Sequence, residues 1–97
     1  MARTPIHPGE ILGDELREIG LSHEKLGRDI GVSGSTVSRI VAGKQAITAD
    51  MALRLAHWFG SSPELWTNLQ TQYDLRAAEA RIGGSMKDSP TRAQAGP

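Results

Sequence analysis

Apolar residues recur three or four positions apart in several stretches of the chain, the spacing that gathers side chains on one face of an α-helix. In the first stretch this face holds Ile11, Leu12, Leu16 and Ile19, with the acidic residues mostly on the other side. The pattern predicts helices over residues 8–19, 23–30, 34–42, 49–59 and 63–82. Because the connections between them are short, the sequence predicts an all-α domain of five helices.

Residues that start and end helices stand at the borders of these stretches. Hydroxyl side chains that can cap a helix N-terminus are Ser22, Ser33, Thr48 and Ser62. Pro8 and Pro63 suit the first helical position, where a missing N–H costs nothing. Glycines that can end a helix are Gly20, Gly31, Gly43 and Gly60.

Both ends of the chain are expected to be flexible. Pro5 and Pro8 keep residues 1–7 out of regular structure. Residues 83–97 hold two prolines, three glycines and almost nothing to bury, so they cannot offset the entropy of ordering. The folded domain is therefore expected to span residues 8–82.

Residues 22–44, SHEKLGRDIGVSGSTVSRIVAGK, predict two short helices joined by a tight turn. Gly27 is small enough for two helices to cross closely, Gly31 begins the turn, and Val32 fills the junction. The second helix buries an apolar stripe and leaves its polar side chains outward. This layout is that of a helix-turn-helix, which presents its second helix to the major groove of DNA.

The outward side chains of that second helix suit DNA recognition. Ser33, Ser35 and Thr36 lie near its start, where they can touch phosphates or base edges. Arg39, one turn further on, can donate two hydrogen bonds to guanine O6 and N7. Countercharge for phosphates would come from Lys25, Arg28 and Lys44.

Charge and composition narrow the classes of function. Formal net charge is zero, which argues against a basic coat that binds nucleic acid without regard to sequence. The segment 22–44 nevertheless carries four basic and two acidic side chains. Aromatic residues make up 4%, so the core should be aliphatic, and without cysteine no disulfide or zinc–thiolate site can form. No apolar run is long enough for a membrane span and residues 1–10 lack a secretory signal, so we expect a cytoplasmic protein.

Other kinds of site find little support. The histidines His7, His23 and His57 fall on separate elements without the spacing of metal ligands, so no metal site is expected. No nucleophile stands beside a base in a readable motif, and no glycine-rich phosphate loop follows a strand. We expect no catalytic residues and no cofactor, and an enzyme is the weakest interpretation.

Two levels of family resemblance attach to these segments. The run GVSGSTVSRIVAGK (residues 31–44) resembles the XRE-type helix-turn-helix regulators. HPGEIL (7–12), and GKQAITADMALRLAHWFGSSPELWTNLQTQYDL (43–75), resemble the HigA-type (VapI-like) antitoxins of bacterial type II toxin–antitoxin modules. The resemblance implies a lambda-repressor-like fold. It also implies a dimeric repressor of its own operon that neutralises a RelE-like, mRNA-cleaving toxin.

The resemblance also assigns roles to single residues. His23 is the first residue of its helix, a position that often contacts phosphate and is commonly glutamine in such regulators. The base-reading positions correspond to Gly34, Ser35 and Arg39, with Thr36 and Ser38 alongside. Gly34 replaces a longer residue of many relatives, which shifts the expected base contacts to Ser35, Thr36 and Arg39.

A palindromic double-stranded operator requires a two-fold dimer with half-sites about one helical turn apart. The helix over residues 63–82 has apolar residues to spare and is the expected interface, with Leu69 and Tyr73 as its contacts. Trp66 is instead expected to pack this helix onto the one before it. Two alternatives stay open: an XRE-type regulator without a toxin, and a helical protein-interaction module that does not bind DNA.

Overall fold

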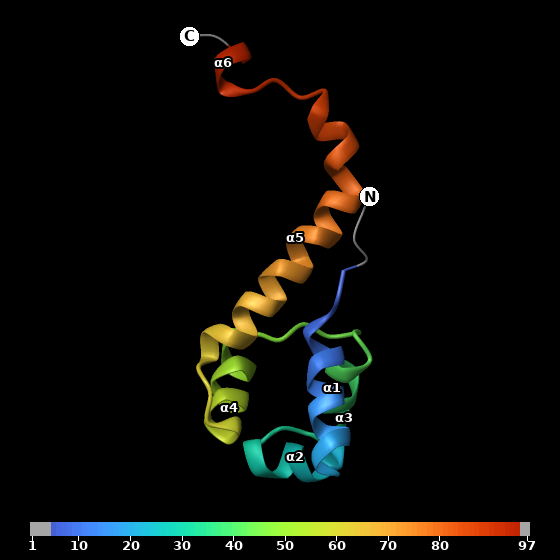
Figure 1. Cartoon of the computed structure of the whole chain (residues 1–97), viewed down its shortest axis with the longest axis vertical. Helices are drawn as coiled ribbons and strands as arrows, with labels where there is room; N and C mark the ends of the chain where they lie inside the picture. The colour runs from blue at the N-terminus through green and yellow to red at the C-terminus, as the bar shows by residue number, and fades with distance from the viewer. Residues whose placement is uncertain (1–4, 96–97) are drawn as a thin grey trace.

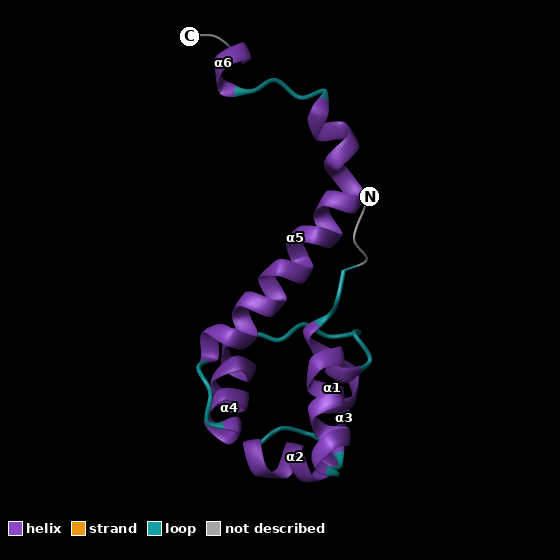
Figure 2. Ribbon diagram, viewed as in Figure 1, coloured by secondary structure: helices purple, strands orange, loops and turns teal. Residues whose placement is uncertain are grey.

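The structure, a computed structural model, describes residues 5–95 and contains six helices and no strand within that range. They are α1 (Pro8–Ile19), α2 (His23–Ile30), α3 (Gly34–Val41), α4 (Ala49–Phe59), α5 (Pro63–Lys87) and α6 (Arg92–Ala95). Figure 1 shows α1 to α4 and the start of α5 gathered into one body, from which the rest of α5 projects. Figure 2 shows the same path as helices joined by loops. The all-α prediction is confirmed, and α3 ends one residue early because Ala42 forms its C-cap.

Hydroxyl side chains cap the helices at the predicted positions. Each hydroxyl oxygen accepts a hydrogen bond from the backbone N–H three residues further on; these caps are Ser22, Ser33, Thr48 and Ser62. Local sequence chemistry therefore fixes where α2 to α5 begin.

His7 caps α1 and belongs to the folded domain rather than to the predicted flexible lead. Its Nδ1 atom accepts a hydrogen bond from the Gly9 N–H at 2.9 Å, and the Glu10 carboxylate accepts one from the His7 N–H at 3.1 Å. The ring is buried and lies edge-on to Tyr73 of α5, with centroids 4.8 Å apart. The proline pattern gave no sign of this distant contact. The predicted lead at residues 1–4 lies outside the described part of the chain.

α5 continues past the predicted end at residue 82, through Gly83 and Gly84, to Lys87. A glycine inside a helix costs only about 1 kcal/mol relative to alanine, and the next proline is Pro90. The tail therefore begins beyond α5, and its flexibility stays a prediction. Within residues 5–95 no helix, long α5 included, has the apolar length needed to cross a membrane.

The core between α1 and α5 is mainly aliphatic. Its buried members are Leu12, Leu16, Leu26, Ile30, Val37, Ile40, Ile47, Met51, Ala52, Leu55, Ala56 and Trp66. Trp66 lies against Phe59 of α4, with ring centroids 5.7 Å apart, which confirms its expected packing role. Ile19, counted on the apolar face of the first helix, is instead 53% exposed. The apolar pattern thus marks the centre of α1 better than its end.

Two glycines allow backbones to approach closely. A Cβ at Gly27 would lie 2.6 Å from the Val32 carbonyl oxygen and 3.1 Å from the Gly34 nitrogen, so α2 sits directly on the turn that leads into α3. This confirms the expected close crossing. A Cβ at Gly9 would lie 1.7 Å from the Ile40 carbonyl oxygen, an α1–α3 contact that the sequence did not reveal.

Two polar side chains connect α4 and α5 to the rest of the domain. The Arg54 guanidinium of α4 donates to the carbonyl oxygen of Ile30, at the end of α2, at 2.6 Å. The buried Gln70 of α5 accepts a hydrogen bond from the Ile47 N–H at 2.8 Å and donates one to Asp74 at 2.9 Å. The later helices thereby hold α2 and the α3–α4 loop in place. Neither contact was predicted.

Candidate nucleic-acid interface

α3 presents a continuous polar face to solvent. Val37 and Ile40 are buried in the core, while the side chains that the sequence assigned to DNA point the other way. Exposed or half-exposed on this face are Ser33, Ser35, Thr36, Ser38 and Arg39. α2 and the turn into α3 lie at the end of the body remote from the projecting part of α5 (Figure 1). The start of α3 therefore lies away from the projecting part of α5.

The N-terminus of α3 is organised by its cap. The Ser33 Oγ atom accepts a hydrogen bond from the Thr36 N–H at 3.1 Å and lies 2.9 Å from the Thr36 hydroxyl oxygen. The first N–H groups of a helix have no partner inside it, so those of Gly34 and Ser35 can hold a phosphate oxygen. Ser35 is exposed beside this cap.

Gly34 faces α2. A Cβ built at this position would lie 3.0 Å from Glu24 Cγ and 3.1 Å from Glu24 Cα. A longer side chain here would therefore meet α2 before it could point outward. Any contact of Gly34 with DNA must come from its backbone, which agrees with the expected shift of base reading to its neighbours.

Arg39 is held by two hydrogen bonds on the exposed face. Its Nε–H donates to the Gln45 side-chain oxygen at 2.9 Å, and Nη2 donates to the Thr36 hydroxyl oxygen at 3.4 Å. Gln45 lies in the loop after α3 and was not among the predicted site residues. Its position six residues after Arg39, beyond the helix end, gave no periodic signal. The contact extends the candidate interface into the α3–α4 loop.

His23 and Ser38 connect α2 to α3. The His23 Nδ1 atom lies 2.8 Å from the Ser38 hydroxyl oxygen. When that hydroxyl donates to Nδ1, the ring proton lies on Nε2 and can be donated to a phosphate. The structure thus brings together two residues that the sequence had placed separately among the DNA contacts.

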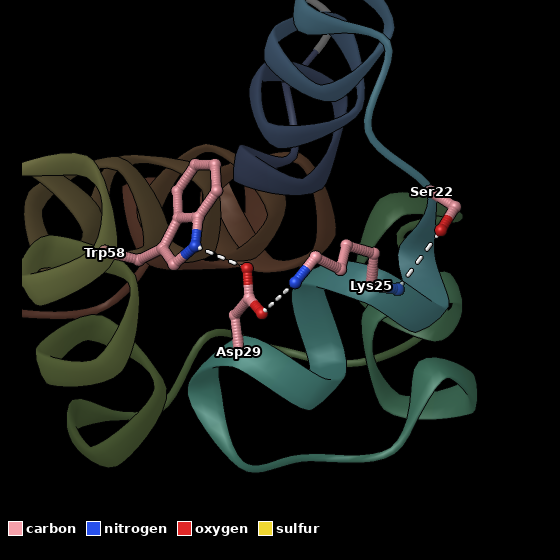
Figure 3. A network of polar contacts seen from close by, with 4 residues as sticks. All are labelled: Ser22, Lys25, Asp29 and Trp58. Atoms are coloured by element: carbon pink, nitrogen blue, oxygen red, sulfur yellow. Dashed lines mark hydrogen bonds and ion pairs between the residues drawn. The ribbon is translucent and has the colours of Figure 1, made fainter.

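The basic side chains around the motif differ in their surroundings. Lys25 pairs with Asp29 at 2.8 Å, and the Trp58 indole N–H donates to the same carboxylate at 3.1 Å, as Figure 3 shows. The Lys25 hydrogen bond, followed by that of Trp58, lowers the pKa of Asp29 and keeps it charged. Because Asp29 compensates Lys25, the countercharge of this segment rests more on Arg28 and Lys44, both of which are exposed.

The predicted dimer contacts are partly used within the chain. Leu69 packs against the core, and Tyr73 lies edge-on to the buried His7 ring. Further along α5, Leu75 is 49% exposed and Ile82 is 40% exposed. These two side chains share a face of α5 that lies about half a turn from Tyr73, so they form a second apolar face beside the predicted contacts.

The three histidines lie apart, on the α1 cap, α2 and α4. Among residues 5–95 no three His, Cys, Asp or Glu side chains gather closely enough to hold a metal ion.

Comparison with known proteins gives the family. Residues 14–66, more than half of the chain, match the Helix-turn-helix family HTH_3. Virulence-associated protein I of Dichelobacter nodosus is 49% identical over 75 residues, which cover 76% of this chain and 69% of that protein. Antitoxin HigA-1 of Vibrio cholerae is 38% identical over 74 residues, covering 75% and 70%. The solved structure of Pseudomonas aeruginosa antitoxin HigA with the higBA promoter has a TM-score of 0.88 at 43% identity, covering 92% of this chain and 98% of that one.

Proposed function

The chain belongs to the helix-turn-helix family and, within it, to the HigA-type antitoxins, and from this premise we propose three linked activities. It forms a dimer, it represses its own operon by binding double-stranded operator DNA through α3, and it neutralises a RelE-like, mRNA-cleaving toxin. The family consists of DNA-binding regulators and antitoxins rather than enzymes. Each activity would take place in the cytoplasm, where the operon and the ribosome lie.

The exposed polar face of α3 is the observation that supports operator binding. Ser35 and Thr36 occupy the first turn, from which a recognition helix reads base edges and phosphates. Arg39 is held on the same face, and its guanidinium can donate to guanine O6 and N7. The solved relative bound to its promoter supports the same use of the motif.

Fluorescence anisotropy with the chain's own promoter tests this proposal. We expect tight binding that weakens as salt rises and that exceeds binding to a scrambled duplex of the same length. Ser35→Ala should weaken binding, while Arg81→Ala, on the projecting part of α5, should not. Equal affinity for both duplexes would overturn sequence-specific repression and leave the protein-interaction module as the better interpretation.

α5 supports the proposed dimer. On the projecting part of α5, Leu75 and Ile82 are exposed and, seven residues apart, share one helix face that a second copy of the helix could cover. Sedimentation velocity should give a dimer at micromolar concentration, and Leu75→Glu should shift it towards monomer. A wild-type monomer at high concentration would refute the proposal.

Toxin neutralisation is tested with the neighbouring gene. A small basic reading frame beside this one should arrest growth when expressed alone, and co-expression of this chain should restore growth. The purified complex should also lack ribosome-dependent mRNA cleavage. If no neighbour is toxic while operator binding holds, the chain is a regulator without a toxin.

A further inference from the structure

We propose that Gln45 is a specificity-determining positioning residue, which orients Arg39 for base reading from the α3–α4 loop. The inference rests on the proposed operator binding and deepens it, because it concerns how the same interface selects its sequence. Gln45 is not part of the helix-turn-helix segment 22–44. Its role follows from contacts that only the folded chain creates.

The hydrogen bond between Arg39 and Gln45 determines which edge of the guanidinium remains free. Guanidinium has five N–H donors in a rigid plane. The Gln45 side-chain oxygen accepts a hydrogen bond from the Arg39 Nε–H at 2.9 Å, and the Thr36 hydroxyl oxygen accepts one from Nη2 at 3.4 Å. Nη1 and the remaining Nη2 hydrogen then form the outward edge, which has the spacing of guanine O6 and N7. The side chain is thereby restricted before DNA arrives, which lowers the entropy lost on binding.

Gln45 is itself held on a fixed backbone. The Lys44 N–H donates to the Arg39 carbonyl oxygen at 2.9 Å, so the start of the loop is bonded to the backbone of Arg39 itself. Gly43 has φ +76°, a left-handed value that lets the chain make this turn beside His7. Two residues after Gln45, Ile47 is 3% exposed, and its N–H donates a hydrogen bond to the buried Gln70 side chain at 2.8 Å. The backbone on either side of Gln45 is therefore anchored.

The amide chemistry explains why a neutral residue suits this place. The Gln45 carbonyl oxygen accepts from Arg39 and leaves the charge of the guanidinium uncompensated, so that charge stays available to DNA. A carboxylate at the same place would hold Arg39 more strongly, but it would cancel the charge and repel phosphates. Gln45→Glu should therefore bind the operator more weakly than Gln45→Ala, although it keeps an acceptor.

A double-mutant cycle on the full chain tests the proposal. Operator Kd is measured for wild type, Gln45→Ala, Arg39→Ala and the double variant, on the wild-type operator and on duplexes with each guanine replaced in turn. Gln45→Ala should weaken binding about fivefold or more, the scale of coupling between contacting side chains. The loss should fall on the guanine whose replacement Arg39→Ala tolerates. In the Arg39→Ala background, Gln45→Ala should change Kd by less than about twofold.

Three outcomes overturn the proposal: no loss of affinity in Gln45→Ala, tighter binding, or a loss that persists without Arg39. Tighter binding would mean that Gln45 sequesters Arg39, and a persistent loss would mean that Gln45 acts only through the loop. Wild type that ignores its promoter would instead refute the proposed function. A DNA-free measurement then still decides the contact. The Arg39 Nε–H should exchange slowly with water in NMR spectra of wild type and fast in Gln45→Ala, and fast exchange in both refutes the inference.

Discussion

Replacement of Gly27 by alanine tests the close packing inside the helix-turn-helix, because two physical effects predict opposite changes in the free energy of unfolding. Alanine is favoured over glycine in a helix by about 1 kcal/mol, and propensity alone would therefore stabilise the protein. The added Cβ, however, would lie 2.6 Å from the Val32 carbonyl oxygen. An ordinary carbon–oxygen contact is about 3.3 Å, so the turn must move by roughly 0.7 Å.

The turn has little room for that movement. The atoms met by the Cβ are all backbone, and the Val32 N–H is bonded to the Gly27 carbonyl oxygen at 2.9 Å. Overpacking of this kind costs about 1–3 kcal/mol, and the upper end applies where backbone rather than a flexible side chain must shift. After the gain in propensity, we expect Gly27→Ala to lose about 2 kcal/mol of unfolding free energy.

Thermal and urea unfolding followed by circular dichroism measure this change. For a domain of this size, about 1 kcal/mol corresponds to a shift in Tm of 4–8 °C, so Tm should fall by about 8–16 °C. Gly83→Ala is the matched control, because it also lies inside a helix but its Cβ would meet nothing within 4 Å. That variant should keep or raise Tm. A Gly27→Ala protein that melts at or above the wild-type temperature would refute the close-packing account.

Further changes test the DNA contacts and the α1 cap. Arg39→Ala should weaken operator binding by about 1–3 kcal/mol and relax preference at one base pair, and unchanged affinity would remove Arg39 from the reading surface. Lys44→Ala should weaken binding evenly across sequences and lower the salt slope by about 1, so an unaltered slope would exclude a phosphate contact. Burial lowers the pKa of His7 below its ordinary 6.5, against the opposing carboxylates of Asp74 and Glu10. The unfolded chain therefore takes up the proton first, and stability present above pH 6.5 should fall as pH drops below 6.5. His7→Asn, which keeps an acceptor for the cap, should flatten this dependence in urea titrations, whereas the exposed His57→Asn should not.

Much of the fold and part of the interface follow from local sequence chemistry. Caps such as Ser22 and Ser33 act within three residues, so the helix borders could be predicted without knowledge of the fold. The outward face of α3 could be predicted too, because helical spacing puts Val37 and Ile40 on one side. The extent of α5 could not, since the small cost of two glycines does not by itself end a helix.

Tertiary structure alone decided the contacts between residues far apart in the chain. The sequence places His7 in a flexible lead, whereas in the structure its ring packs edge-on against Tyr73 of α5. The sequence gives no sign that the Gln70 side chain accepts a hydrogen bond from the Ile47 N–H. Such pairs depend on how the helices cross, and no short-range spacing encodes that.

The outward face of α3 likewise depends partly on local sequence and partly on tertiary structure. Arg39 is evident from helical spacing, because the same period that buries its neighbours turns it outward. The hydrogen bond that the Arg39 Nε–H donates to the Gln45 side-chain oxygen forms only after the chain has left α3 and turned back on itself. The sequence thus determined which side chains of α3 face outward, and the packing of α5 on the α3–α4 loop decided how one of them is held. The physical reason is range: caps and helical faces are set within a few residues, whereas loop placement depends on the whole core.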